Sequence, residues 1–180
     1  LLHRGKLPTA AQLDEFEKKI RSERSLPEGV IEFLKGAPTD ANPMDVVRTG
    51  ISMLGLYDAR VTTGGAHLEE NEAIGMSIVA KIPVVVAAYH RFRQGLDLPP
   101  VREDLNEAAH LLYLINGEVP TDRAIRTLDV ALTLHADHGM NASTFSARVT
   151  VATLSDMYSA ITSAIGTLKG PLHGGANEGV

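Results

Sequence analysis

Helix-start signals recur along the whole chain, and they constrain its fold more than any other feature. Thr9 is followed three residues later by Gln12, the pattern of a capping box, and Leu13, Phe16 and Ile20 then recur at helical spacing. Comparable signals predict helices that begin near Pro27 and Asn42, and others that cover about residues 69–94, 104–115, 121–134, 141–151 and 155–168. The fold class predicted from this pattern is all-α.

Evidence for β-strands is thin. Val84-Val85-Val86 is β-branched, but it lies within a longer pattern of helical period. Pro83 is expected to kink the helix over residues 69–94 or to split it in two. The Gly-containing residues 62–67 are expected to form a surface loop, and Pro99-Pro100 a linker. We interpret residues 1–180 as a single helical unit.

Two of the expected helices, Ile74–Ala88 and Ser159–Leu168, are apolar on more than one side. A helix of this kind is buried within a larger body. A domain of this size buries only about 70% of the surface that its unfolded chain exposes. The multihelical fold is therefore expected to pack around buried central helices and to present a partner surface, for a second copy or for further sequence.

Composition narrows the classes of function. Lys and Arg number 17 against 22 Asp and Glu, so the net charge of −5 disfavours a nucleic-acid-binding protein. The chain has no cysteine, which agrees with a reducing, cytoplasmic location. No secretory signal is predicted at the N-terminus. The most apolar stretch, Ala73–Ala88, is interrupted by Lys81 and Pro83, so no membrane span is expected.

One candidate for chemistry is His173, which lies between a Gly-Pro turn and Gly174-Gly175. The glycines allow a close backbone approach to a ligand and leave the ring unshielded. If a helix starts after His173, its dipole favours a neutral imidazole that can donate a hydrogen bond to a carbonyl on which charge develops. Such a donor is worth roughly 2.7–4 kcal/mol of barrier. A capping or buried structural histidine is the alternative interpretation.

A second polar segment contains His135 and His138, which would share a helix face because they are three residues apart. A metal site is disfavoured because no third ligand is evident nearby. His138, before the Gly139 bend, better suits recognition of a substrate carboxylate or hydroxyl, whereas His135 is expected to pack or to orient its neighbours. Asn141 and Ser143 are expected to cap the following helix.

Other histidines give weaker signals. His110 is expected at an exposed helix position, and His67 and His3 show no partner. The Tyr89–Arg93 segment is interpreted as structural, because positive charge near a helix C-terminus complements the dipole. A phosphate contact by this segment is the alternative.

The two polar segments together resemble one enzyme family. Gly170-Pro171-Leu172-His173-Gly174-Gly175-Ala176-Asn177-Glu178 is similar to the catalytic-histidine motif of the citrate synthases, and residues 134–145 are similar to their oxaloacetate-binding segment. Residues 42–49 and 82–95 resemble the bacterial-type citrate and 2-methylcitrate synthases. The resemblance extends over essentially all 180 positions.

The resemblance implies a homodimeric acyltransferase of the tricarboxylic acid cycle that condenses acetyl-CoA with oxaloacetate and releases citrate and CoA. His173 would donate a hydrogen bond to the thioester carbonyl, His138 would contact oxaloacetate, and Ser143, supported by Asn141, would orient the His173 ring. Acetyl-CoA would be a substrate, and neither a metal nor a cofactor is implied. The resemblance also implies an incomplete large domain, in which the catalytic base and the carboxylate-binding arginines are absent and the fragment alone is inactive.

Two other functions are considered. A 2-methylcitrate synthase would use propionyl-CoA through the same site. A non-catalytic helical dimerisation module is the alternative from a different class, and the intact histidine segments disfavour it for the parent protein.

Overall fold

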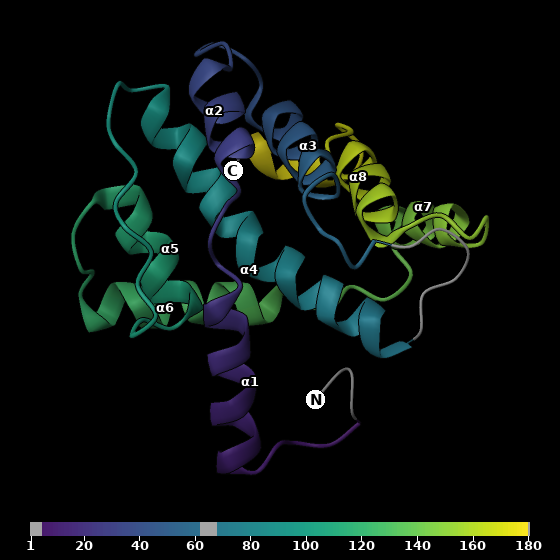
Figure 1. Cartoon of the computed structure of the whole chain (residues 1–180), viewed down its shortest axis with the longest axis horizontal. Coiled ribbons are helices and arrows are strands. Elements are labelled where there is room, and N and C mark those ends of the chain that lie inside the picture. Colours follow the sequence, from purple (N-terminus) through teal and green to yellow (C-terminus); the bar gives the residue numbers. More distant parts are fainter. Residues whose placement is uncertain (1–4, 62–67, 180) are drawn as a thin grey trace.

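The structure is a computed structural model that describes residues 5–61 and 68–179 and is all-helical over these residues (Figure 1). The helices are α1 (Ala10–Ser22), α2 (Glu28–Gly36), α3 (Pro43–Leu54), α4 (Leu68–Phe92), α5 (Glu107–Asn116), α6 (Asp122–Leu134), α7 (Ala142–Val151), α8 (Met157–Leu168) and the 3-10 helix η1 (Gly174–Gly179). The predicted fold class is confirmed. The surface loop expected at residues 62–67 lies outside the described residues.

Side-chain caps define most of the helix starts. The Thr9 hydroxyl and the Gln12 side chain form the predicted capping box of α1. Thr121 and Asp156 cap α6 and α8, as their sequence signals predicted. Helix α5 begins at Glu107, three residues later than expected, because the Asn106 side chain accepts a hydrogen bond from the Ala109 N–H.

Helix α4 is the centre of the fold and packs against α1, α2, α3, α5 and α8. It runs through Pro83 as one helix, so the alternative of two separate helices is wrong. Val84, Val85 and Ala87 next to the proline are buried, and this packing compensates for the backbone hydrogen bond that a proline removes.

The length and apolar composition of α4 would also suit a membrane-crossing helix. Half of its most apolar window is buried inside the protein, which is the pattern of a core helix. Besides Leu68 at its start, two large apolar residues of α4 are exposed: Val79 and Val86, seven residues apart, with exposed fractions of 55% and 37%.

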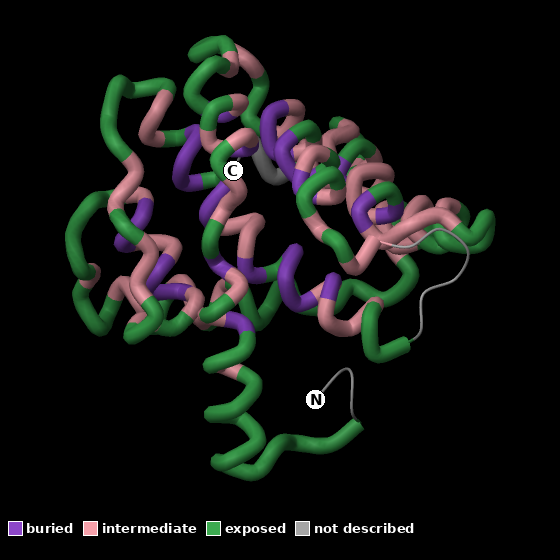
Figure 2. Tube along the Cα trace, in the orientation of Figure 1, coloured by how far each residue is buried: buried purple, intermediate pink, exposed green. Residues whose placement is uncertain are grey.

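The main core lies between α2, α3, α4 and α8, and a smaller one lies between α4 and α5 (Figure 2). Val30, Ile51 and Val85 at the main core are fully buried. Helices α6 and α7 have no buried residue. Helix α7 packs chiefly against α8, and α8 packs against α3 (Figure 1). The α7–α8 pair is therefore a hairpin attached to the body through α8.

Candidate active site

The loop between α6 and α7 leads the chain into the N-terminal end of α7. Gly139 adopts a left-handed conformation with φ of 59°, and its N–H donates to the Asp137 carboxylate. The Asn141 side chain then accepts a hydrogen bond from the Thr144 N–H at 3.0 Å, which makes Asn141 the cap of α7. These local bonds fix the direction in which the first turn of α7 presents its side chains.

Ser143 and His173, which are thirty residues apart, meet at one end of the α7–α8 hairpin. The Ser143 hydroxyl oxygen lies 2.6 Å from His173 Nε2. Ser143 therefore does not cap α7, as one expectation had it, because its hydroxyl faces the imidazole instead. Both residues are half-buried, so the ring is held by this contact and is still partly accessible.

The turn that carries His173 folds back onto the C-terminal end of α8. A Cβ atom on Gly174 would lie 2.6 Å from the Leu168 carbonyl oxygen, and one on Gly175 would lie 2.7 Å from the Lys169 carbonyl oxygen. Only residues without a side chain fit here. The His173 N–H also donates to the Gly170 carbonyl at 2.9 Å. The glycines thus serve the packing of this turn.

The two other histidines of the segment lie on the surface. The ring Nδ1 of His135 is 2.7 Å from the Ala131 carbonyl of the preceding helix turn, a local contact. His138 is exposed, and its ring makes no hydrogen bond within the described part of the chain. In residues 5–61 and 68–179, no three His, Asp or Glu side chains lie close enough together to hold a metal ion.

Helix α8, which leads to His173, is bonded to distant segments at both ends. At its start the Tyr158 hydroxyl donates to the Asp58 carboxylate at 2.7 Å, and Arg60 binds the same carboxylate. Burial alone would raise the pKa of Asp58, but the hydrogen bonds from Arg60 and Tyr158 lower it to about 2.

The other end of α8 is held by Lys169, which follows the helix directly. Its Nζ lies 2.5 Å from a carboxylate oxygen of Asp45, in the first turn of α3. The other carboxylate oxygen of Asp45 lies 3.0 Å from Arg48. The hydrogen bond from Lys169 is the main reason that the pKa of Asp45 lies below its ordinary value.

His110 is fully buried, so its predicted exposed position is wrong. The cause is Arg24, also fully buried, which donates to the Leu105 carbonyl at 2.9 Å and to the Glu107 carboxylate at 2.6 Å. This arginine draws the start of α5 against the segment that follows α1. His110 Nε2 accepts a hydrogen bond from the Arg102 N–H at 3.4 Å.

The Tyr89–Arg93 segment has structural contacts, as predicted. Tyr89 donates to the Pro38 carbonyl at 2.7 Å, and Arg91 donates to the Ile115 carbonyl at 3.0 Å. Arg93 lies over the Tyr89 ring. These bonds join α4 to the neighbouring loops and leave the phosphate alternative without support.

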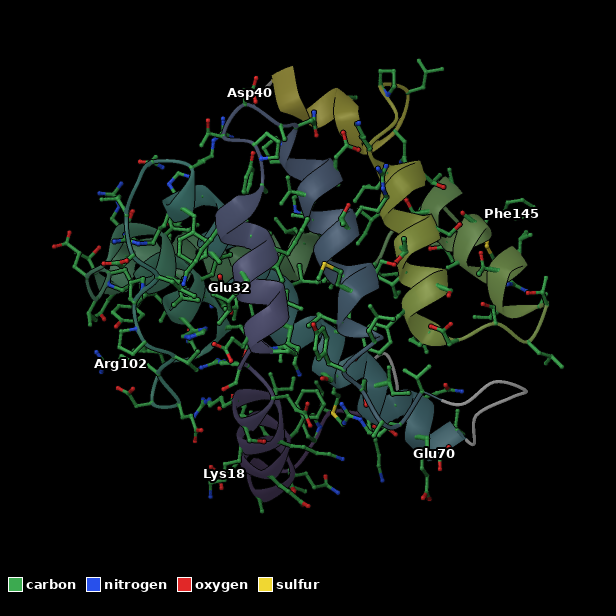
Figure 3. All side chains as sticks on the ribbon, turned by 45° about the horizontal axis from the view of Figure 1, so that its top comes forward. Lys18, Glu32, Asp40, Glu70, Arg102 and Phe145 are labelled. Atoms are coloured by element: carbon green, nitrogen blue, oxygen red, sulfur yellow. The ribbon has the colours of Figure 1, made fainter. Side chains whose placement is uncertain are left out.

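A surface pocket of about 410 Å³ lies between α7 and α8. Phe145, Ser146 and Val149 of α7 face Ser163 and Thr167 of α8 across it. Phe145, labelled in Figure 3, is 63% exposed at the surface of this hairpin. Neither His138 nor His173 lines this pocket.

The sequence reasoning assigned no role to Lys169 and Asp45, or to Tyr158 and Asp58. Their only local signals were a lysine at a helix end and an aspartate in a first helical turn, both of which complement a helix dipole. The pairs join residues 124 and 100 positions apart, and no spacing pattern reveals such contacts.

Comparisons with known proteins identify the family of the chain. Residues 1–180 match the family described as citrate synthase, C-terminal domain. A citrate synthase of Haloferax volcanii is 49% identical over 100% of this chain and 48% of its own length. Citrate synthase 2 of Bacillus subtilis is 47% identical over 100% of the chain and 48% of its own length. A 2-methylcitrate synthase of Shewanella oneidensis is 43% identical over 97% of the chain and 45% of its own length.

Solved structures show the same fold. The citrate synthase of Pyrobaculum aerophilum superposes with a TM-score of 0.89 at 38% identity, over 97% of this chain and 45% of that one. A ternary complex of the Thermoplasma acidophilum enzyme with carboxymethyl coenzyme A and oxaloacetate gives 0.88 at 26% identity, over 98% and 45%. The chain thus spans about half the length of the relatives it matches. By the match over its whole length and by its fold, it belongs to the citrate synthase family.

Proposed function

We propose that the full-length protein is a citrate synthase, an acyltransferase that condenses acetyl-CoA with oxaloacetate and water to give citrate and CoA. The observation that carries the proposal is the 2.6 Å contact between Ser143 and His173, within a family match that covers residues 1–180. The relatives named citrate synthase, at 45–49% identity, support it. In this proposal acetyl-CoA is a substrate, and no metal or resident cofactor takes part.

The proposed role of His173 follows from its two ring nitrogens. If the Ser143 hydroxyl donates to Nε2, a neutral imidazole carries its proton on Nδ1. That N–H is then a donor for the thioester carbonyl of acetyl-CoA. As a base removes a proton from the methyl carbon, negative charge develops on this carbonyl oxygen, and the hydrogen bond strengthens. The enol carbon then attacks the keto carbon of oxaloacetate.

We assign His138 to the oxaloacetate. Its exposed ring is not engaged by another residue in the described segments, and the left-handed Gly139 turns the chain directly after it. The loop enters α7 three residues later, at the helix end where Ser143 meets His173. The Thermoplasma acidophilum complex, whose description names a coenzyme A derivative and oxaloacetate, supports the two proposed substrates.

Replacing His173 with Ala in the full-length protein tests the proposal. Loss of one oxyanion donor is expected to lower kcat about a hundredfold or more. His90→Ala is a matched control, because His90 is exposed on α4 and the partner of its ring within the described segments is Gln94, one turn away. Unchanged turnover in His173→Ala would exclude His173 from the mechanism. A full-length protein without synthase activity would instead favour the non-catalytic helical module.

Relatives named 2-methylcitrate synthase, at 43–45% identity, favour a second candidate activity. In that reaction propionyl-CoA replaces acetyl-CoA, and His173 has the same role. The ratio of kcat/KM for the two thioesters in the full-length protein separates the candidates. A ratio that favours propionyl-CoA would overturn the primary assignment.

We also propose a homodimer that acts in the cytoplasm. The exposed Val79 and Val86, seven residues apart on the central helix α4, support a second copy as the partner of this face, and the absence of cysteine agrees with a reducing compartment. Sedimentation of Val79→Glu should then show a shift towards monomer relative to the unchanged protein. Equal sedimentation of both would exclude this face as the interface.

A further inference from the structure

On the side of the hairpin, the turn that carries His173 contacts α7 and α8. Ser143 of α7 contacts the ring, and the last carbonyls of α8 pack against Gly174 and Gly175. Among residues 5–61 and 68–179, one side-chain bond joins the start of this turn to the body of the protein. It is the 2.5 Å contact from Lys169 Nζ to Asp45.

The geometry of this ion pair suits a fixed anchor. Asp45 lies in the first turn of α3 and Lys169 directly follows α8, so each charge complements the dipole of its own helix. The two side chains are 35% and 36% exposed, and Arg48 holds the second oxygen of the carboxylate at 3.0 Å. The carboxylate is thus oriented from two directions, by Arg48 on one oxygen and by Lys169 on the other.

The ion pair between Lys169 and Asp45, which we call the anchor, lies where the turn that carries His173 begins. The Lys169 carbonyl packs against Gly175, and the Gly170 carbonyl accepts hydrogen bonds from the N–H groups of both His173 and Gly175. A change in the position of Lys169 is therefore transmitted through backbone bonds to His173. Surface ion pairs contribute little to overall stability, so a local positioning effect is the more informative property to measure.

We propose that Lys169 and Asp45 are positioning residues that fix the His173 imidazole against Ser143 and in its working direction. This inference rests on the proposed function for its catalytic meaning, but the placement of the ring can be measured independently. Release of the anchor should loosen the turn and weaken the contact between the hydroxyl and Nε2. A misplacement of about 1 Å in a catalytic group can lower a rate about a hundredfold.

The test compares four variants of the full-length protein. Lys169→Met removes the charge and keeps the side-chain length, Asp45→Asn removes the partner charge, and Lys169→Arg keeps the ion pair. Tyr158→Phe is the matched control, because it removes a hydrogen bond at the opposite end of α8. The readouts are the ¹⁵N chemical shifts of the His173 ring, which report its tautomer and hydrogen bonding, and kcat.

Lys169→Met and Asp45→Asn should shift both ring-nitrogen signals and lower kcat between about tenfold and a hundredfold. Lys169→Arg should resemble the unchanged protein. Tyr158→Phe should lower the melting temperature without moving the His173 signals. The proposal is overturned if Lys169→Met and Asp45→Asn leave the ring signals as they are, or if Tyr158→Phe moves them equally. If the signals move but His173→Ala keeps its turnover, the proposed function fails and the positioning role stands.

Discussion

Mild acid should destabilise the protein through His110. Burial, together with the nearby charge of Arg24, lowers the pKa of His110 from 6.5 to about 4. The unfolded chain therefore binds this proton more readily than the folded one. His110 therefore contributes about 3 kcal/mol to the free energy of unfolding above pH 6.5, and this contribution is lost as the pH falls from 6.5 towards 4.

At pH 5 the two pKa values imply a loss of about 2 kcal/mol relative to pH 8. The arginines near the ring do not produce this loss. Arg24 and Arg102 keep their charge throughout this range. The contribution of Asp58, whose folded pKa is about 2, is lost only as the pH falls from about 4 towards that value.

Urea unfolding of the 180-residue chain from pH 8 to pH 5 measures the effect. His110→Gln has a side chain that is neutral at every pH, so its free energy of unfolding should fall by about 2 kcal/mol less than that of the unchanged chain. Leu114→Val is the matched control, because Leu114 is fully buried in the same helix and titrates nothing. It should lower stability by about 1 kcal/mol at all pH values. Parallel curves for His110→Gln and the unchanged chain would refute the reasoning.

Two further predictions concern the hairpin. Gly174→Ala places a methyl group against the Leu168 carbonyl, so it should lower the free energy of urea unfolding by about 1–3 kcal/mol and disturb the His173 ring signals. Gly75→Ala is the control: a Cβ atom there meets open space beside α4, so this change should leave the free energy of unfolding unchanged or raise it. Tyr158→Phe should cost about 1.5–3 kcal/mol and raise the pKa of Asp58, as carboxylate titration by NMR would show; an unmoved Asp58 would contradict the role of this hydrogen bond.

The contacts that the sequence predicts correctly join residues only a few positions apart. The Thr9–Gln12 capping box and the Asn141 cap each close within three residues, and the structure contains both. The meeting of Ser143 and His173 came from a family resemblance, because spacing alone does not join residues thirty positions apart.

Packing decided what the local pattern left open. Pro83 predicted either a kink or a split of the helix, and α4 continues through it because neighbouring helices bury the residues that follow. Conversely, α6 has the apolar stripe of a core helix, and none of its residues is buried. The apolar stripe of α6 indicates that this face of the helix packs against another surface, but the pattern does not identify that surface.

His110 and His173 show why residue type and helical position do not predict the environment of a histidine. The backbone of the turn that carries His173 depends on its own motif, because Gly174 and Gly175 pack directly on the end of α8, whereas the contact of the ring with Ser143 comes from thirty residues away. The environment of His110 depends on Arg24, whose bond to Glu107 joins positions 83 residues apart. Because that arginine brings a buried charge to the start of α5, a position that the helical pattern assigns to solvent becomes part of the interior. The contacts of a histidine are therefore predictable where neighbours along the chain determine them, as for His135 and the Ala131 carbonyl, and they require the tertiary structure where a distant side chain determines them.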